Sequence, residues 1–133
     1  MNKLNYLFRG SGAGDYVTSE KLNEEMRQFY MKKPFHIFWK WVTKERNSPG
    51  WGAVNIINYP IGKIITADDA QISDQQCGPG LHVFRPGLRP EWFGLENNNL
   101  ICIEVKVMSE DICFAGLPTM DAKIRVKKLE VLT

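Results

Sequence analysis

Residues 75–87 read QQCGPGLHVFRPG, which combines a tight turn with the beginning of a strand. The Gly-Pro-Gly turn at residues 78–80 precedes a short β-branched and aromatic run, and Pro86-Gly87 ends that run. The run contains His82, one of only two histidines in the chain, and it is followed by Arg85 and Arg89. Guanidinium groups held next to prolines are suited to a bidentate grip on phosphate or carboxylate.

A strand over residues 81–84 would place Leu81 and Val83 on one side and His82 and Phe84 on the other. His82 then has two interpretations: a histidine satisfied inside the sheet or at its rim, or a ligand-contacting group. A metal site is not expected, because the spacing of the cysteines is not that of ligands. A Cys/His nucleophile is not indicated either, since nothing near Cys77 would activate a thiolate.

The clearest strand pattern lies at residues 100–108, LICIEVKVM, where Ile103 and Val105 face the expected core. Residues 122–132 alternate in the same way, with Ile124 and Val126 inward and Lys123, Arg125, Lys127 and Lys128 outward. The alternation slips at Lys127-Lys128, which predicts a β-bulge there. Shorter strands are expected at 61–66 and 111–114.

The N-terminal region predicts a short strand at residues 5–8, a glycine-rich loop and then a helix. The loop, RGSGAG at 9–14, is either a plain turn or a ligand-contacting loop, and it lacks the ending of a P-loop. A helix capped by Thr18 or Ser19 is expected to run to about Lys32. Its apolar face consists of Leu22, Met26, Phe29 and Tyr30.

The most aromatic segment, FHIFWKWVT at residues 35–43, alternates as a strand. One side carries Phe35, Ile37, Trp39 and Trp41, and the other carries His36, Phe38, Lys40 and Val42. We expect this strand to form a hairpin with residues 53–59. The tryptophans at 39, 41 and 51 either belong to the core or form a ladder on which a base could stack.

Composition limits the classes of protein that the chain can belong to. With 133 residues and 44% hydrophobic residues, residues 1–133 are expected to form a single domain with a substantial core. The formal net charge of +2 gives no broad basic surface for duplex nucleic acid. No apolar run approaches the length of a membrane span, and three cysteines at unrelated spacings favour a reducing cytoplasm over a disulfide framework.

These patterns predict an α+β fold: a mostly antiparallel, twisted sheet of six to eight short strands with one main N-terminal helix. The connections after residue 60 are too short for βαβ crossovers, which argues against a parallel sheet.

The half of the chain from about Gly62 to Leu132 resembles a family of small phage and prophage proteins of unknown function. The shared elements are a glycine-opened strand, CGPGLHV at residues 77–83, SEDI at 109–112 and KIRVKKLEVL at 123–132. This resemblance implies a phage-encoded protein acting in the cytoplasm of an infected or lysogenic host. It carries no assigned chemistry.

A second resemblance is to ADP-ribosyltransferase-like folds. It rests on YLFRG at residues 6–10, followed by a helix, and on GPGLHVF at 78–84. In that family an Arg or His and a second polar residue from these strands hold a nicotinamide nucleotide, which implies such a role for Arg9 and His82. The catalytic glutamate motif of the family is not found in this chain. The candidates for a catalytic carboxylate are Glu104, which lies on an expected strand, and Glu91 and Glu96.

Three hypotheses on function follow, in this order. The first is a binding protein that captures an anionic, nucleotide-like small molecule, and the phage resemblance implies that this molecule is a host defence signal. Its expected ligand-binding residues are Arg9, Gly10, Gly12, His82, Arg85, Arg89 and Trp92. The second is an enzyme acting on NAD or a nucleotide, and the third is a structural or interaction protein. We expect no cofactor and no metal, and a homo-oligomer is left open.

Overall fold

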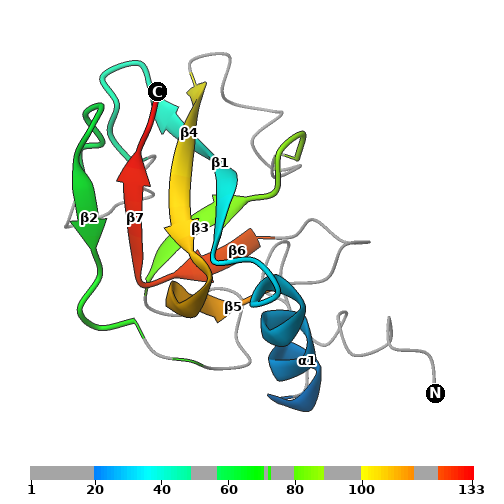
Figure 1. The fold of residues 1–133 in the computed structure, drawn as a ribbon. Helices are drawn as coiled ribbons and strands as arrows, with labels where there is room; N and C mark the ends of the chain where they lie inside the picture. The colour runs from blue at the N-terminus through cyan, green and yellow to red at the C-terminus, as the bar shows by residue number, and fades with distance from the viewer. Residues whose placement is uncertain (1–19, 49–56, 71, 73–79, 89–99, 116–122) are drawn as a thin grey trace, which may run out of the picture.

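The computed structural model describes residues 20–48, 57–70, 72, 80–88, 100–115 and 123–133 (Figure 1). Within these ranges the chain forms one α-helix, one 3₁₀ helix and seven strands. In chain order they are α1 (Glu20–Tyr30), β1 (Phe35–Thr43), β2 (Ile64–Thr66), β3 (Leu81–Phe84), β4 (Leu100–Met108), η3 (Ser109–Asp111), β5 (Ile112–Phe114), β6 (Lys123–Val126) and β7 (Lys128–Val131). The expected strand at residues 5–8 lies outside the described residues.

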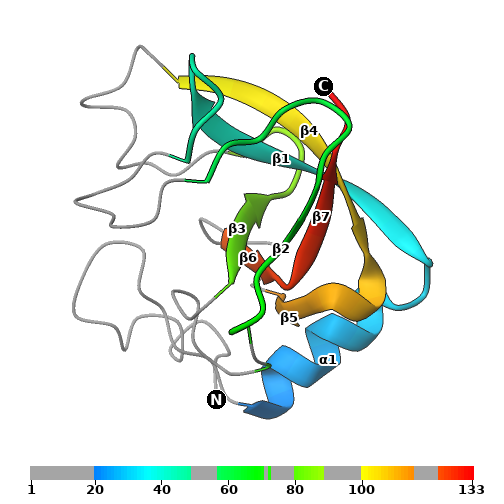
Figure 2. The same cartoon turned by 90° about the vertical axis from the view of Figure 1, so that its left-hand side faces the viewer.

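The seven strands form one sheet in the order β2-β7-β4-β1-β3-β6-β5, and every neighbouring pair is antiparallel. The predicted α+β class and antiparallel pairing are therefore confirmed for the described residues. Figures 1 and 2 show that β3 and β6 run at a steep angle to β4 and β7, so the sheet curls strongly.

The middle of the sheet is the β1–β4 pair, which has nine residue pairs in register. On β4 the side chains alternate between exposed and buried, and Ile103, Val105 and Val107 point into the core. On β1 the buried side is the one that carries Phe38 and Val42. The predicted inward position of Ile103 and Val105 is confirmed, because both are essentially inaccessible to solvent.

The prediction of a β-bulge at Lys127-Lys128 is wrong. Here the chain changes partners: β6 pairs with β3 and β5, whereas β7 pairs with β4 and β2. The backbone N–H of Lys127 donates to the carbonyl of Asp111 over 2.8 Å, which fixes the corner. A slip in a period-two pattern is compatible with a bulge or with a corner between strands, so the pattern alone could not distinguish them.

The predicted hairpin between residues 35–43 and 53–59 is also not formed by β1 itself, because β1 has β4 on one side and β3 on the other. Pairing with the later segment begins only beyond the end of β1, at the isolated bridge between Asn47 and Asn58. Residues 53–56 lie outside the described residues. Tyr59 is buried and packs into the core cluster.

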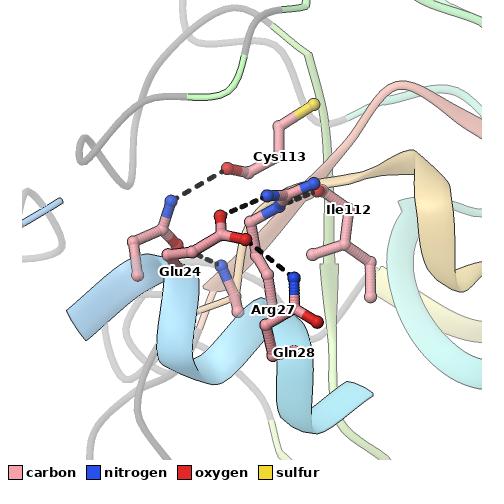
Figure 3. A network of polar contacts seen from close by, with 7 residues as sticks. Glu24, Arg27, Gln28, Ile112 and Cys113 are labelled. Atoms are coloured by element: carbon pink, nitrogen blue, oxygen red, sulfur yellow. Dashed lines mark hydrogen bonds and ion pairs between the residues drawn. The ribbon is translucent and has the colours of Figure 1, made fainter. Parts of the chain in front are cut away.

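Helix α1 is fixed to β5, the last strand of the sheet. Asn23 donates its amide N–H to the carbonyl of Cys113 over 3.2 Å, and its amide oxygen accepts the N–H of Ala115 at 3.0 Å. Arg27, which also pairs with Glu24, donates from Nε to the carbonyl of Ile112 at 2.8 Å (Figure 3). These contacts satisfy backbone groups of β5 that a further strand would otherwise bind.

The helix ends at Tyr30, two residues before the predicted end. The carbonyl of Tyr30 accepts hydrogen bonds from His36 Nε2 at 2.8 Å and from Ser109 Oγ at 3.1 Å, in addition to the backbone N–H of Lys33. Leu22 and Tyr30 of the predicted apolar face are buried, but Phe29 is 57% exposed.

Strands β1 and β3 pair in a much shorter stretch than β1 and β4. Their register contains a single residue pair, Trp39 with Phe84. Two side chains of β1 add hydrogen bonds across this junction: Lys40 Nζ donates to the carbonyl of His82, and Trp41 Nε1 donates to the carbonyl of Leu88. We call this junction the β1–β3 seam.

Candidate functional site

The β3–β6 pair is buried on both faces, unlike β4. Leu81, Val83, Ile124 and Val126 belong to the main core cluster. On the other face His82 lies opposite Arg125 and Phe84 lies opposite Lys123. This assignment confirms the predicted faces of residues 81–84. The pairing of β3 with β6 also joins two parts of the pattern on which the phage-family resemblance rests, because CGPGLHV includes residues 81–83 of β3 and KIRVKKLEVL includes β6.

The prediction that Arg125 points outward to solvent is wrong. Its side chain has 0% exposure, which makes it the largest fully buried side chain of the described residues. The alternation of β6 was predicted correctly, but the second face of this strand is covered rather than open. A buried guanidinium is stable in a protein only when its donors are satisfied.

Position 80, directly before β3, requires glycine because the backbone there lies very close to Arg125. A Cβ atom at this position would lie 2.9 Å from Cγ of Arg125 and 3.1 Å from the carbonyl oxygen of Val126. Its φ angle of +142° is also one that side-chain-bearing residues rarely adopt. The turn therefore contains glycine here so that β3 can start directly against the stem of the buried arginine.

Lys40 is buried at the β1–β3 seam. Its Nζ donates to the carbonyl of His82 over 2.7 Å and lies 4.8 Å from the centre of the Tyr59 ring. Burial, with the charge of Lys123 as a second cause, lowers the pKa of Lys40 to about 7. Within the described part of the chain, Lys40 forms no ion pair.

Together these residues define what we call the basic cluster, which gathers on β1, β3 and β6 and on the residue that follows β3. Its members are Lys40, His82, Arg85, Lys123 and Arg125. His82, Lys123 and Arg125 share one face of the β3–β6 pair, whereas Lys40 lies on the core side of β1 with Phe38 and Val42. Lys123 is nevertheless near enough to Lys40 to affect its pKa. A group of lysine and arginine side chains favours an anion as its ligand.

Arg85 connects the basic cluster to the end of α1. Its guanidinium donates to the hydroxyl of Tyr30 at 2.8 Å. Tyr30 itself packs edge-on against His36 and Phe38, with ring centres 5.1 and 5.8 Å away. The position of Arg85 is thus set by a buried tyrosine on a different element, which orients the guanidinium before any ligand binds.

The structure describes two of the seven predicted ligand-binding residues, His82 and Arg85, and they lie three residues apart at the end of β3. The other five, Arg9, Gly10, Gly12, Arg89 and Trp92, lie outside the described residues, so a shared site with Arg9 stays a prediction. Of the glutamates considered for transferase chemistry, Glu91 and Glu96 are also outside. Glu104 is exposed on β4, which is separated from β3 by β1.

No protein-family model, curated protein or solved structure matches this chain. Both resemblances therefore stay predictions that rest on the residues quoted for them. Within the described ranges there is no helix long and apolar enough to cross a membrane. The same part of the chain contains no group of three or more His, Cys, Asp or Glu residues that could hold a metal ion.

Sequence reasoning missed three members of the basic cluster: Lys40, Lys123 and Arg125. The period-two pattern put Lys40 on the same side of β1 as Phe38 and Val42, but it did not say that this side is the buried one. Arg125 gave no such signal, because a charged residue that alternates with Ile124 and Val126 normally faces solvent.

The aromatic ladder is present in part. The rings of Trp39 and Trp41 are 6.2 Å apart in an edge-to-face arrangement, and both residues are half-buried. The Trp41 ring is held by its hydrogen bond to Leu88, and Trp51 lies outside the described residues. Base stacking on this ladder stays a prediction.

Proposed function

We propose that this protein binds a small anionic, nucleotide-like molecule at the basic cluster. The observation that supports this proposal most is the position of Lys40, a buried amine near Lys123 that donates to the backbone carbonyl of His82. Burial near a like charge disfavours the charged form of an amine, and an anion bound nearby would favour that form.

A bound phosphate would stabilise the protonated form of Lys40, whose pKa is lowered to about 7 in its absence. Binding near neutral pH is then expected to take up a proton, and affinity should fall as the pH rises above 7. Arg85 supplies the planar, bidentate donor that phosphate oxygens favour. The half-buried tryptophans of β1 provide apolar rings on the strand next to β3, where a base could pack.

Binding is favoured over catalysis because Glu104, the strand carboxylate considered for transferase chemistry, is exposed on β4 rather than beside His82. The proposed phage origin, and a role in sequestering a host defence signal, rest on the resemblance of residues 62–132 and extend the same proposal. A role as an interaction protein would use a different surface, the edge strand β2.

The proposal is tested by calorimetric titration with AMP, ADP-ribose and inorganic phosphate. A charge-assisted contact to phosphate contributes about 1.5–3 kcal/mol, so Arg85→Ala should weaken AMP binding about tenfold to a hundredfold. Lys106→Ala, which removes a cation from the outer face of β4, is the matched control and should leave the affinity unchanged. Absence of binding to all three probes, or equal losses in both variants, would contradict the proposal.

A further inference from the structure

Strand β2 ends the sheet on the side opposite to β5, and in Figure 1 it forms the margin of the ribbon. It pairs only with β7, through Ile64, Ile65 and Thr66. The flanking hydrogen bonds fix which groups point to β7: Val131 N–H donates to the carbonyl of Lys63, and Ala67 N–H donates to the carbonyl of Lys127. Because antiparallel ladders alternate, Ile65 is the next residue bonded to β7.

The N–H and C=O groups of Ile64 and Thr66 therefore point away from β7, along the free edge. Within the described ranges no strand lies beyond β2, and neither residue has another hydrogen-bond partner. The side chain of Ile64 is 57% exposed, and Ile61 just before the strand is 68% exposed. An open edge with apolar side chains is a template for pairing with another strand.

The charges around β2 favour a second copy of the same strand as that partner. The segment reads Lys63, Ile64, Ile65, Thr66, Ala67, Asp68 and Asp69, so it is basic at one end and acidic at the other. In an antiparallel pair centred on Ile65, Ile64 lies opposite Thr66 of the second copy, and Lys63 lies opposite its Ala67, one residue before Asp68. The same register pairs the outward-pointing groups of Ile64 with those of Thr66.

We propose that two copies of this chain associate through β2, antiparallel and with a two-fold axis at Ile65. The sheet then continues from one copy into the other. Ile64 also lines a groove of about 180 Å³ together with residues of β4, η3 and β7, so the second copy would lie close to this groove. A contact based on three-residue strands is small, and small interfaces give weak complexes, so the dimer forms at high protein concentration.

Sedimentation equilibrium over a wide concentration series tests this inference. The wild-type chain is expected to pass from monomer to dimer. Thr66→Pro removes only an N–H that points away from β7, and it should raise the dimer dissociation constant about tenfold or more because two hydrogen bonds per dimer are lost. Circular dichroism should show an unchanged fold.

A charge exchange provides the second variant. Lys63→Glu should also weaken the dimer, by repulsion from Asp68 and Asp69, and the triple variant Lys63→Glu, Asp68→Lys, Asp69→Lys should restore it. Lys32→Glu makes the same charge change after α1, away from β2, and should have no effect. A wild-type chain that stays monomeric at every concentration overturns the inference. So does a dimer that Thr66→Pro and Lys63→Glu leave unchanged, which would place the contact elsewhere.

Discussion

The Nζ atom of Lys40 lies 2.7 Å from the carbonyl oxygen of His82, and this bond crosses the sheet where β1 and β3 pair at one position only. The same lysine therefore has two roles in the structure. It joins the strands at the seam, and it carries an amine whose pKa is lowered to about 7 in a buried place. Substitutions at Lys40 separate these two contributions.

The stability of the fold should depend on pH through Lys40. Its pKa is about 7 in the folded chain and near its ordinary value of 10.5 in the unfolded chain, so between these values the unfolded state binds more protons. The free energy of unfolding should then rise with pH over this window, by up to about 1.4 kcal/mol per pH unit for one proton, and the gain is absent below pH 7. Urea denaturation at several pH values measures it.

Lys40→Met should remove this slope, because it replaces the amine by an apolar side chain of similar length. Lys32→Met is the matched control, since Lys32 is exposed and should leave the slope as in the wild-type chain. Equal slopes in the wild-type chain and in Lys40→Met would show that another group titrates in this window.

The contact between Gly80 and Arg125 can be tested by adding one methyl group. Gly80→Ala would place a Cβ 2.9 Å from the arginine stem at a φ angle of +142°, so both a clash and backbone strain arise. We expect a loss of about 2–4 kcal/mol in the free energy of unfolding, from strain of about 1–3 kcal/mol and an overpacked neighbour.

Gly87→Ala separates the two causes, because Gly87 also has a positive φ angle, +89°, but has no atom within 4 Å of an added Cβ. It should cost only the strain, and therefore less than Gly80→Ala. If thermal or urea denaturation finds the two variants equally stable, the approach of Gly80 to Arg125 is not a tight one.

The core of β4 gives a third prediction. Ile103→Ala should lower the free energy of unfolding by about 2–4 kcal/mol, because it leaves a cavity in a side of the sheet that is fully covered. Glu104→Ala at the next position faces solvent and should change stability by less than about 0.5 kcal/mol. Similar losses in both variants would contradict the assigned faces of β4.

The cysteines should differ in reactivity. Cys102 is exposed, but desolvation and the nearby Glu104 raise its pKa to about 11, and burial raises the pKa of Cys113. At neutral pH we therefore expect slow alkylation of Cys102, and reaction of Cys113 only after unfolding. Mass spectrometry of the unreduced, denatured chain should find three alkylated cysteines; fewer would reveal a disulfide.

How far the sequence could predict this structure depended on whether one face or two faces of a strand are buried. For β4, alternation with one solvent face was enough, and Ile103 and Val105 were placed correctly. For β6 the same rule predicted that Arg125 faces solvent, which is wrong. The second face of β6 is covered by tertiary packing, and such a covered face produces no periodic pattern in the sequence. The corner at Lys127 was not predicted for a related reason: non-local contacts decide which strands pair, and the sequence pattern does not show them.

The candidate site was predictable to a similar extent. Residues 81–85 were singled out because glycine, proline, histidine and arginine occur there together, and His82 and Arg85 do lie in the basic cluster. Lys40 comes from a strand more than forty residues earlier. Only the folded sheet brings it to the same seam.

The central claim, that the basic cluster holds an anionic nucleotide-like molecule, is tested most directly by native mass spectrometry after incubation with a cellular nucleotide extract. We predict that the wild-type chain retains a ligand, that denaturation releases it chemically intact, and that Arg85→Ala loses it while Lys106→Ala keeps it. A wild-type spectrum that shows only the bare chain would contradict the claim. Release of a cleaved product would instead identify an enzyme.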